Sequence, residues 1–269
     1  MVAYAFTIAG SEATGAAGFQ TDLKTFHELG VFGMGALTCI VSIDPKNEWF
    51  HRFSPIAPDV IHDQIESALA ARDIDTVKIG MLGTPETIET VSKALKSQTW
   101  RNIVLDPVLI CKGGEMGTAR DVDVALAEKI LPQATVVTPN LFEARTLAGM
   151  EKLEKVSDLA EAGRRISEKG PRYVLVKGGV DLEGPEAIDV LWDGENATIY
   201  AEPKIGQERV SGAGCTLAAA ITAELAKGTE IHEAVHTAKR LVTASIEGRV
   251  TANTPFDCVW QGAYSERKK

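Results

Sequence analysis

The sequence predicts an α/β fold: a single domain with a mainly parallel central sheet and helices on both faces. Short apolar runs alternate with amphipathic stretches along almost the whole chain, which is typical of strands joined by crossover helices. No Gly-, Ser- and Pro-rich linker and no internal repeat divides the chain, so one domain is expected over residues 1–269. Only the tail, at about residues 250–269, is expected to be peripheral. With 45% hydrophobic residues, a chain of 269 residues can bury a sizeable core without disulfide or metal support.

The first half of the chain alternates strand-like and helix-like segments. Glycines or polar residues follow each apolar run, and Gly30 closes the first helix-like segment. Apolar residues recur at helical spacing in the segment that contains Ile61 and Ile65. The expected strands are residues 2–9, 35–43 and 76–79, and the expected helices are residues 20–29, 58–71 and 86–96.

The second half repeats the pattern and adds a hairpin. Two β-like runs flank Asp193-Gly194, a pair typical of a tight turn between antiparallel strands. The expected strands are residues 103–105, 135–137, 173–176, 187–191 and 197–201, and the expected helices are residues 122–130, 141–148, 156–168, 215–226 and 231–246.

Charge and cysteine content narrow the class of protein. The net charge of −9 argues against nucleic-acid and membrane partners, which require clustered Lys and Arg. The four cysteines have no CxxC spacing, and the N-terminus reads directly into a strand rather than a signal peptide. No apolar run approaches the roughly 18 residues of a membrane span. We therefore expect a cytoplasmic protein with reduced thiols.

Chemistry is expected just beyond the ends of the strands. In open parallel sheets, ligands bind outside the carboxyl ends of the strands. That rule selects Gly10-Ser11, Ile43-Asp44, Gly80-Met81, Asp106-Pro107, Asn140 and Lys177.

The segment Ser211-Gly212-Ala213-Gly214-Cys215-Thr216 is the most informative of all. It leads directly into an apolar helix, whose first amides are unpaired and can bind an anion. A tight turn before a buried helix explains the same residues equally well. We expect the helix start to lower the pKa of Cys215, whose thiolate could then accept a proton from an alcohol. The alternative is a packed, inert thiol.

Two further segments carry candidate ligands for a metal ion or phosphates. Asp106 ends a buried strand and suits a Mg²⁺ held largely through water, and Lys112 in a Gly-rich stretch could neutralise a phosphate. A solvated loop lysine is the alternative for Lys112. Asn140 and Glu143 are spaced as a capping box, which is the interpretation that the residues alone favour.

Seven motifs, at residues 7–11, 15–26, 78–82, 105–108, 138–144, 176–179 and 212–216, follow one another along nearly the whole chain. In order and spacing they resemble the ribokinase-like superfamily. More narrowly, they resemble the branch of hydroxymethylpyrimidine (phosphate) kinases and bacterial pyridoxal kinases. The resemblance implies an α/β fold and transfer of the ATP γ-phosphate to a hydroxymethyl group on an aromatic heterocycle.

The resemblance also implies a role for individual residues. Cys215 would be the catalytic base, Lys112 and the amides of Gly212, Ala213 and Gly214 would stabilise the transferred phosphoryl group, and Asp106 and Glu143 would hold Mg²⁺. The acceptor would contact Gly10, Ala17, Gly18, Val41, Ile43, Met81 and Val108. ATP would contact Asn140, Lys177, Gly178 and Gly179. Relatives of this kind commonly form homodimers, and the resemblance leaves room for a monovalent cation.

Two residues move the expected acceptor from pyrimidine to pyridoxal. Ile43 stands where the pyrimidine kinases usually have Gln or Glu, and Ile cannot pair a buried amine. Cys111 stands before Lys112, as in the two-cysteine pyridoxal kinases, and its thiol could add reversibly to the pyridoxal aldehyde. Ser211 and residues 11–18 depart from the usual motifs, in ways that concern acceptor contacts rather than the phosphate site.

The first hypothesis is therefore a pyridoxal kinase, and the second is a hydroxymethylpyrimidine (phosphate) kinase. A third hypothesis, from another class, is a catalytically silent ligand-binding protein on the same scaffold. Intact Asp106, Lys112, Asn140, Glu143 and Cys215 argue against the third.

Overall fold

A nine-stranded sheet forms the centre of the computed structural model, which describes residues 2–109 and 116–267. The strands lie in the order β3-β2-β1-β4-β5-β6-β7-β8-β9, and β2, β1, β4, β5, β6 and β7 are mutually parallel. β3, β8 and β9 pair antiparallel at the two edges. The bounds are β1 (Tyr4–Glu12), β2 (Phe32–Asp44), β3 (Phe50–Pro55), β4 (Thr76–Ile79), β5 (Asn102–Leu105), β6 (Val136–Val137), β7 (Tyr173–Lys177), β8 (Glu186–Trp192) and β9 (Ala197–Pro203).

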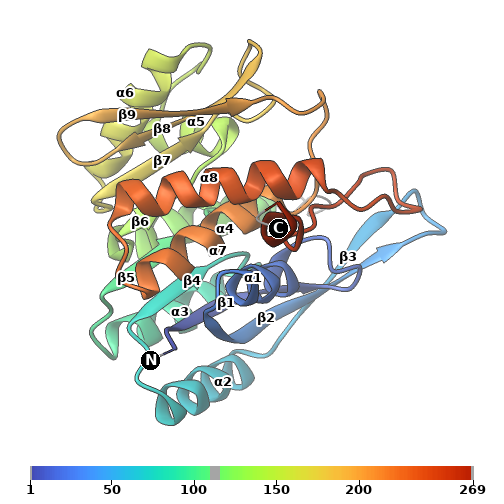
Figure 1. The fold of residues 1–269 in the computed structure, drawn as a ribbon. Coiled ribbons are helices and arrows are strands. Elements are labelled where there is room, and N and C mark those ends of the chain that lie inside the picture. Colours follow the sequence, from blue (N-terminus) through green and yellow to red (C-terminus); the bar gives the residue numbers. More distant parts are fainter. Residues whose placement is uncertain (1, 110–115, 268–269) are drawn as a thin grey trace.

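Helices cover both faces of the sheet. Figure 1 shows α1, α7 and α8 side by side across one face, while α2 to α6 pack on the other. The bounds are α1 (Gly18–Glu28), α2 (Pro58–Ala71), α3 (Pro85–Lys96), α4 (Met116–Lys129), the 3₁₀ turn η1 (Leu131–Gln133), α5 (Leu141–Ala148), α6 (Val156–Ser167), α7 (Ala213–Ala226), α8 (Ile231–Glu247) and α9 (Ala263–Glu266).

The central strands are apolar on both faces because each face is covered. Val104 and Val136 pack toward α7 and α8, and their neighbours Leu105 and Val137 pack into the cluster beneath α2 to α6. This alternation is the period of two expected of a strand, with both faces buried. α7 is buried almost all round, as its nearly continuous apolar sequence indicates. The predicted α/β class and parallel centre are confirmed.

Three differences from the expected elements matter for the site. β2 is longer than residues 35–43, and β3, which pairs with it, was not expected. β3 is an edge strand with mixed polarity, so it lacks an apolar run, and the turn before it places Glu48 and Trp49 at positive φ. α4 begins at Met116 rather than near residue 122.

The C-terminal stretch differs from its expected peripheral position. The amide of Ser211 donates to the Asp257 carbonyl at 2.9 Å, and the amide of Val259 donates to the Ser211 carbonyl at 3.1 Å. Gln261 is buried and its Nε2 donates to Thr216 Oγ1 at 3.0 Å. The stretch is therefore bound to the segment that opens α7, a tertiary contact that local composition does not reveal.

Candidate active site

A cleft of about 1030 Å³ lies at the carboxyl ends of the parallel strands. It is bordered by residues at or just beyond the carboxyl ends of β1, β2, β4, β5, β6 and β7 and by the start of α7. Fifteen of the residues that the sequence singled out line it: Gly10, Ala17, Gly18, Val41, Ile43, Met81, Asp106, Val108, Asn140, Glu143, Lys177, Gly212, Ala213, Gly214 and Cys215. Of these, the strand-end rule selected Gly10, Ile43, Met81, Asp106, Asn140 and Lys177, and the other nine came from the motifs and the resemblance.

The start of α7 has the geometry of an anion site. Gly212 caps the helix at φ +84°, and a Cβ there would lie 2.1 Å from the Ala16 carbonyl, so only glycine fits. Across this turn the Ala213 amide donates to the Val210 carbonyl at 3.4 Å, and the Thr216 amide donates to the Gly212 carbonyl at 2.8 Å. The amides of Gly214 and Cys215, between these two donors, belong to the first helical turn, whose N–H groups a helix leaves without an internal partner. A Cβ built on Gly214 would lie 3.3 Å from Lys177 Nζ, so an ammonium stands beside those amides. Amides and ammonium together favour an anion.

Cys215 lies in the first turn of α7, partly exposed, and lines the cleft. Burial raises the pKa of its thiol to about 11, and the nearby Lys78 ammonium only partly offsets that rise. The expectation of a lowered pKa is therefore wrong. Cys215 does lie at a helix start, which favours the thiolate. The loss of hydration on burial disfavours the thiolate more strongly, so the pKa rises.

Lys78 and Asp22 form a sealed ion pair beside Cys215. Lys78 Nζ lies 2.8 Å from Asp22 Oδ1 and 2.9 Å from Oδ2, and Thr7 Oγ1 donates to Oδ2 at 2.6 Å. Burial alone would lower the pKa of Lys78, but Asp22 outweighs it and holds the pKa above its ordinary value. Sequence reasoning assigned neither residue a role. The available signal was a lysine inside Thr76–Ile79, a short strand expected to be buried on both faces.

Asp106 and Lys177 form a second pair, which opens onto the cleft. Lys177 Nζ lies 3.1 Å from Asp106 Oδ1, and the Thr138 hydroxyl lies 3.4 Å from the same oxygen. Burial alone would raise the pKa of Asp106, but the charges of Lys177 and Lys78 hold it below its ordinary value. Lys177 therefore lies between a carboxylate and the start of α7, next to where phosphates are expected.

Asn140 and Glu143 cap α5 as a full capping box. The Asn140 amide donates to Glu143 Oε2 at 2.8 Å, and the Glu143 amide donates to Asn140 Oδ1 at 3.0 Å. The favoured interpretation of this pair as a cap is confirmed. Burial raises the pKa of Glu143 to about 7, and Lys177 only partly opposes it.

The carboxylates of Asp106 and Glu143 fit a hard divalent cation. Both line the cleft, and each uses one oxygen in the bonds above, Oδ1 of Asp106 and Oε2 of Glu143. The second oxygen of each is the type of donor that Mg²⁺ prefers. Lys177 lies near both acids, while Lys78 and Arg209, the other described cations that act on them, are paired with Asp22 and Asp181. A further cation would therefore balance the charge here.

Gly178 and Gly179 are not among the residues that line the cleft. The Gly178 amide donates to the Ile188 carbonyl at 2.9 Å and to Asp189 Oδ1 at 3.1 Å. Lys239 Nζ donates to Asp189 Oδ2 at 2.7 Å. Gly178 thus packs against β8, where a Cβ would lie 2.3 Å from the Ile188 carbonyl. Contact of either glycine with ATP stays a prediction. Cys111 and Lys112 lie outside the described residues.

Aromatic residues complete the cleft wall, and sequence reasoning missed them. Phe50, His51 and Phe53 of β3 and Phe256 of the C-terminal stretch all line it. In the sequence the signal was only a cluster of rings at residues 49–53, directly after the predicted strand end at Ile43-Asp44.

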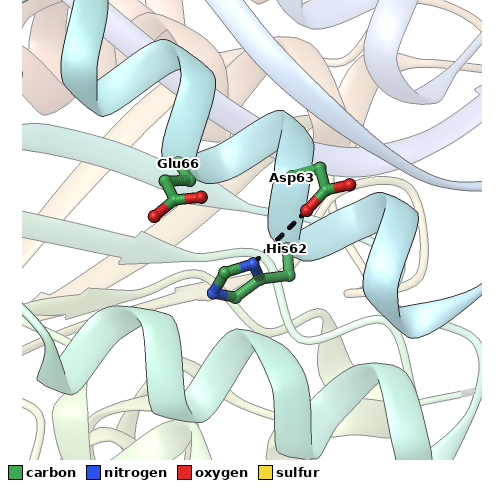
Figure 2. A group of neighbouring side chains, drawn as sticks. All are labelled: His62, Asp63 and Glu66. Carbon is green, nitrogen blue, oxygen red and sulfur yellow. Dashed lines mark ion pairs between the residues drawn. The ribbon is translucent and has the colours of Figure 1, made fainter.

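A second group of ligand-type side chains lies elsewhere. His62, Asp63 and Glu66 are exposed neighbours on α2, with ligand atoms within 4.8 Å of one another, and none of them lines the cleft (Figure 2). Exposed groups of this kind are common on helices and carry no assignment.

No helix within residues 2–109 and 116–267 combines the length and apolar character that crossing a bilayer requires. The sequence matches the phosphomethylpyrimidine kinase family over residues 12–259. The chain belongs to this family. Within the family, it is 46% identical to a pyridoxine kinase of Bacillus subtilis over 243 residues, which cover 90% of each chain.

Solved structures agree with that placement. The ADP complex of Bacillus subtilis pyridoxal kinase superimposes with a TM-score of 0.94 at 43% identity, covering 98% of this chain and 99% of that one. The Staphylococcus aureus pyridoxal kinase in complex with AMP-PCP and pyridoxal gives a TM-score of 0.90 at 39% identity, covering 98% and 95%. The ribokinase-like resemblance inferred from the seven motifs is confirmed.

Proposed function

We propose that the chain is a pyridoxal kinase, which transfers the γ-phosphoryl group of ATP to the 5-hydroxymethyl group of pyridoxal. The observation that carries the proposal is that Ile43, Cys215 and the first residues of α7 line one cleft. An apolar side chain at residue 43 suits a pyridine ring and offers no partner to an aminopyrimidine. The relatives named above act on pyridoxine or pyridoxal.

In this mechanism the start of α7 binds the transferred phosphoryl group. The amides of Gly212, Ala213 and Gly214, together with Lys177, stabilise the charge on its oxygens. Mg²⁺, held through Asp106 and Glu143, would supply further neutralisation of the phosphates of ATP. Lys112 would add a second ammonium from outside the described residues.

Cys215 accepts the hydroxyl proton as the acceptor oxygen attacks phosphorus. Because burial raises the pKa of its thiol to about 11, the thiolate is the minor form at neutral pH. A base works only when deprotonated, so kcat/KM should rise with pH from about 7 toward 9. Lys78, whose charge favours the thiolate, keeps that form accessible.

A substrate panel tests the proposal. The purified chain is assayed under Mg-ATP with pyridoxal, pyridoxine and hydroxymethylpyrimidine, and pyridoxal is expected to give the highest kcat/KM. A kcat/KM for hydroxymethylpyrimidine that is far above the kcat/KM for pyridoxal would make the acceptor assignment wrong. Cys215→Ala should lower turnover by about 10²–10⁴-fold and leave ATP binding nearly intact. Turnover that survives Cys215→Ala, or a flat pH profile, would remove Cys215 as the base.

The second candidate is a hydroxymethylpyrimidine (phosphate) kinase, favoured by the description of the family that the sequence matches. The two acceptors are both aromatic heterocycles with a hydroxymethyl group, so one phosphate site serves either. The same panel separates them. Cys111→Ala adds a test that is specific for the aldehyde, since it should impair pyridoxal use more than pyridoxine use.

The proposal extends to assembly and location. We infer a homodimer acting in the cytoplasm, with ATP and one small acceptor as its ligands. Light scattering of the purified chain tests the homodimer, and a mass of one chain would contradict it.

A further inference from the structure

The β2–β3 ribbon presents a continuous apolar and aromatic platform to the cleft. Ile43 pairs with His51, and Val41 pairs with Phe53, across the antiparallel ladder. Directly opposed residues lie on the same face of a sheet, and residues two apart share that face. All four side chains therefore lie together, and all four line the cleft.

The C-terminal stretch extends the platform. The Phe256 ring lies 6.4 Å from the His51 ring, centroid to centroid, at an interplanar angle of 20°. Phe256 also lines the cleft. Figure 1 shows the C-terminal loop reaching across to the β2–β3 hairpin. Two segments some 200 residues apart thus meet in one wall, by an offset stacked contact.

The stretch that carries Phe256 is built as a short hairpin, residues 250–258. Val250 and Cys258 exchange backbone hydrogen bonds of 2.8 and 3.1 Å. Arg249 Nε pairs with Asp257 Oδ2 at 3.0 Å, and Thr254 Oγ1 donates to the Phe256 carbonyl at 2.7 Å. These bonds hold the hairpin on both sides of Phe256 and fix where its ring lies.

The same hairpin is fastened to the anion site. Asp257, next to Phe256, accepts from the Ser211 amide, and the Val259 amide donates to the Ser211 carbonyl. Ser211 immediately precedes Gly212, the cap of α7, and the side chain of Val259 would lie 3.1 Å from a Cβ built there. The distance between the Phe256 ring and the phosphate-binding amides is therefore set by a few hydrogen-bonded residues.

We propose that Phe256 is a specificity-determining residue, which forms with His51 the wall that receives the aromatic ring of the acceptor. The hydrogen bonds between the hairpin and Ser211 hold this wall at a fixed distance from the anion site. The proposal rests on the proposed function. It assigns the C-terminal hairpin to the active site, although the motifs that identified the site end at residue 216.

The test compares Phe256→Ala with Phe256→Tyr, which keeps the ring. Phe256→Ala should raise KM for pyridoxal about tenfold and change KM for ATP by less than about twofold, because the ring loses its stacking partner while the phosphate site keeps its bonds. Phe256→Tyr should stay within about threefold of the unchanged chain. Asn253→Ala, on an exposed residue of the same hairpin that does not line the cleft, is the matched control and should behave as the unchanged chain.

A double-mutant cycle tests whether the two rings act as one wall. If they do, His51→Ala combined with Phe256→Ala should raise KM for pyridoxal hardly more than the stronger single change. Phe256→Leu replaces Phe256→Ala if the latter melts at a markedly lower temperature. An unchanged KM for pyridoxal, an equal rise in KM for ATP, or fully additive single changes would each overturn the proposal.

A binding measurement separates this proposal from the proposed function. Pyridoxal and hydroxymethylpyrimidine are titrated by calorimetry into the unchanged chain and into Phe256→Ala without ATP. Weaker binding to the variant supports the wall even if the unchanged chain phosphorylates neither compound, in which case only the proposed function fails. The proposal for Phe256 is overturned if the two proteins bind these compounds equally well. It is also overturned if the unchanged chain binds neither pyridoxal nor hydroxymethylpyrimidine.

Discussion

Two lysine–aspartate pairs interact electrostatically with Cys215, and they differ in what surrounds them. Lys78 and Asp22 have side chains that are 0% exposed. Lys177 and Asp106 are 13% and 6% exposed, and both line the cleft. The first pair is packed between α1, β1 and β4, and only Lys78 belongs to the cleft wall, whereas both members of the second pair face the space where a ligand would enter. We call them the sealed pair and the open pair.

The charge balance differs as well. In the sealed pair one carboxylate meets one ammonium, and the Thr7 hydroxyl donates to the same carboxylate. Burial still raises the pKa of Asp22, which Lys78 and Thr7 only partly oppose. At the open pair a second acid, Glu143, shares the same ammonium, and burial raises the pKa of Glu143 to about 7. A buried charge without a full partner is costly. The open pair is therefore incomplete until a cation or a protonated Glu143 balances it.

The differences in exposure and in charge balance indicate a different role for each pair. In the sealed pair each charge faces the other and neither is exposed, so the pair supports the fold and the electrostatic surroundings of Cys215. An open pair with a surplus acid can exchange partners when Mg²⁺ and phosphates enter. Removing the lysine from each pair should therefore affect different measurements.

Lys78→Met should give the largest effect, a loss of about 3–5 kcal/mol in the free energy of unfolding, because it leaves Asp22 charged and unpaired in a dry site. Lys177→Met is the matched change at the open pair. It should cost less than about 2 kcal/mol, since water in the cleft can solvate Asp106. Denaturant unfolding followed by circular dichroism measures both.

The double variant Lys78→Met with Asp22→Leu sharpens the first prediction. Replacing both charges by apolar side chains should recover most of the lost stability, since no unpaired charge remains. Equal stability losses in Lys78→Met and Lys177→Met would contradict the distinction between a sealed and an open pair.

Lys177→Met should show its main effect in turnover. We expect kcat to fall about 10²–10³-fold, because the ammonium beside the first amides of α7 no longer stabilises the transferred phosphoryl group. KM for the acceptor should change little, since Lys177 lies on the phosphate side of the cleft. Release of ADP under saturating Mg-ATP measures kcat. A Lys177→Met protein that keeps more than a tenth of the activity would show that the open pair is not part of the phosphate site.

The open pair could be predicted from the sequence, and the sealed pair could not. Asp106 follows β5 and Lys177 ends β7, and parallel strands bring their carboxyl ends to one edge, so a local rule sufficed to place both residues there. The sealed pair depends on α1 packing over β1 and β4, which places Asp22 against Lys78 from 56 residues away. Only the buried lysine in β4 hinted at it.

The same limit applies to the aromatic wall and to the pKa of Cys215. β3 carries no apolar run, and Phe256 belongs to a hairpin whose residues Asp257 and Val259 are bonded to Ser211. Neither His51 nor Phe256 could therefore be assigned from patterns. For Cys215 the sequence revealed the helix start but not the burial that dominates its pKa. Sequence rules located the phosphate-binding edge, while tertiary packing decides the acceptor wall and the electrostatics.

Glu143→Gln tests the surplus acid of the open pair and should give the smallest effect. The pKa of Glu143 rises from 4.5 to about 7 on folding, so between these values the folded chain binds the proton that the unfolded chain has lost. Stability therefore falls as pH rises through that window. Gln removes this loss and keeps an oxygen for the Asn140 amide. We expect Glu143→Gln to be more stable than the unchanged chain at pH 8, by on the order of 2 kcal/mol, and equally stable near pH 4.5.

Melting curves at both pH values measure the effect, with the exposed Glu151→Gln as a control that should not change the pH dependence. Mg²⁺ supplies an independent check, because it should balance the same surplus charge. At ten times its dissociation constant it would stabilise the unchanged chain by about 1.4 kcal/mol at pH 8, and much less in Glu143→Gln, which lacks the second carboxylate. If Mg²⁺ stabilises both proteins equally, the ion does not use Glu143, and the surplus acid of the open pair is balanced by the proton alone.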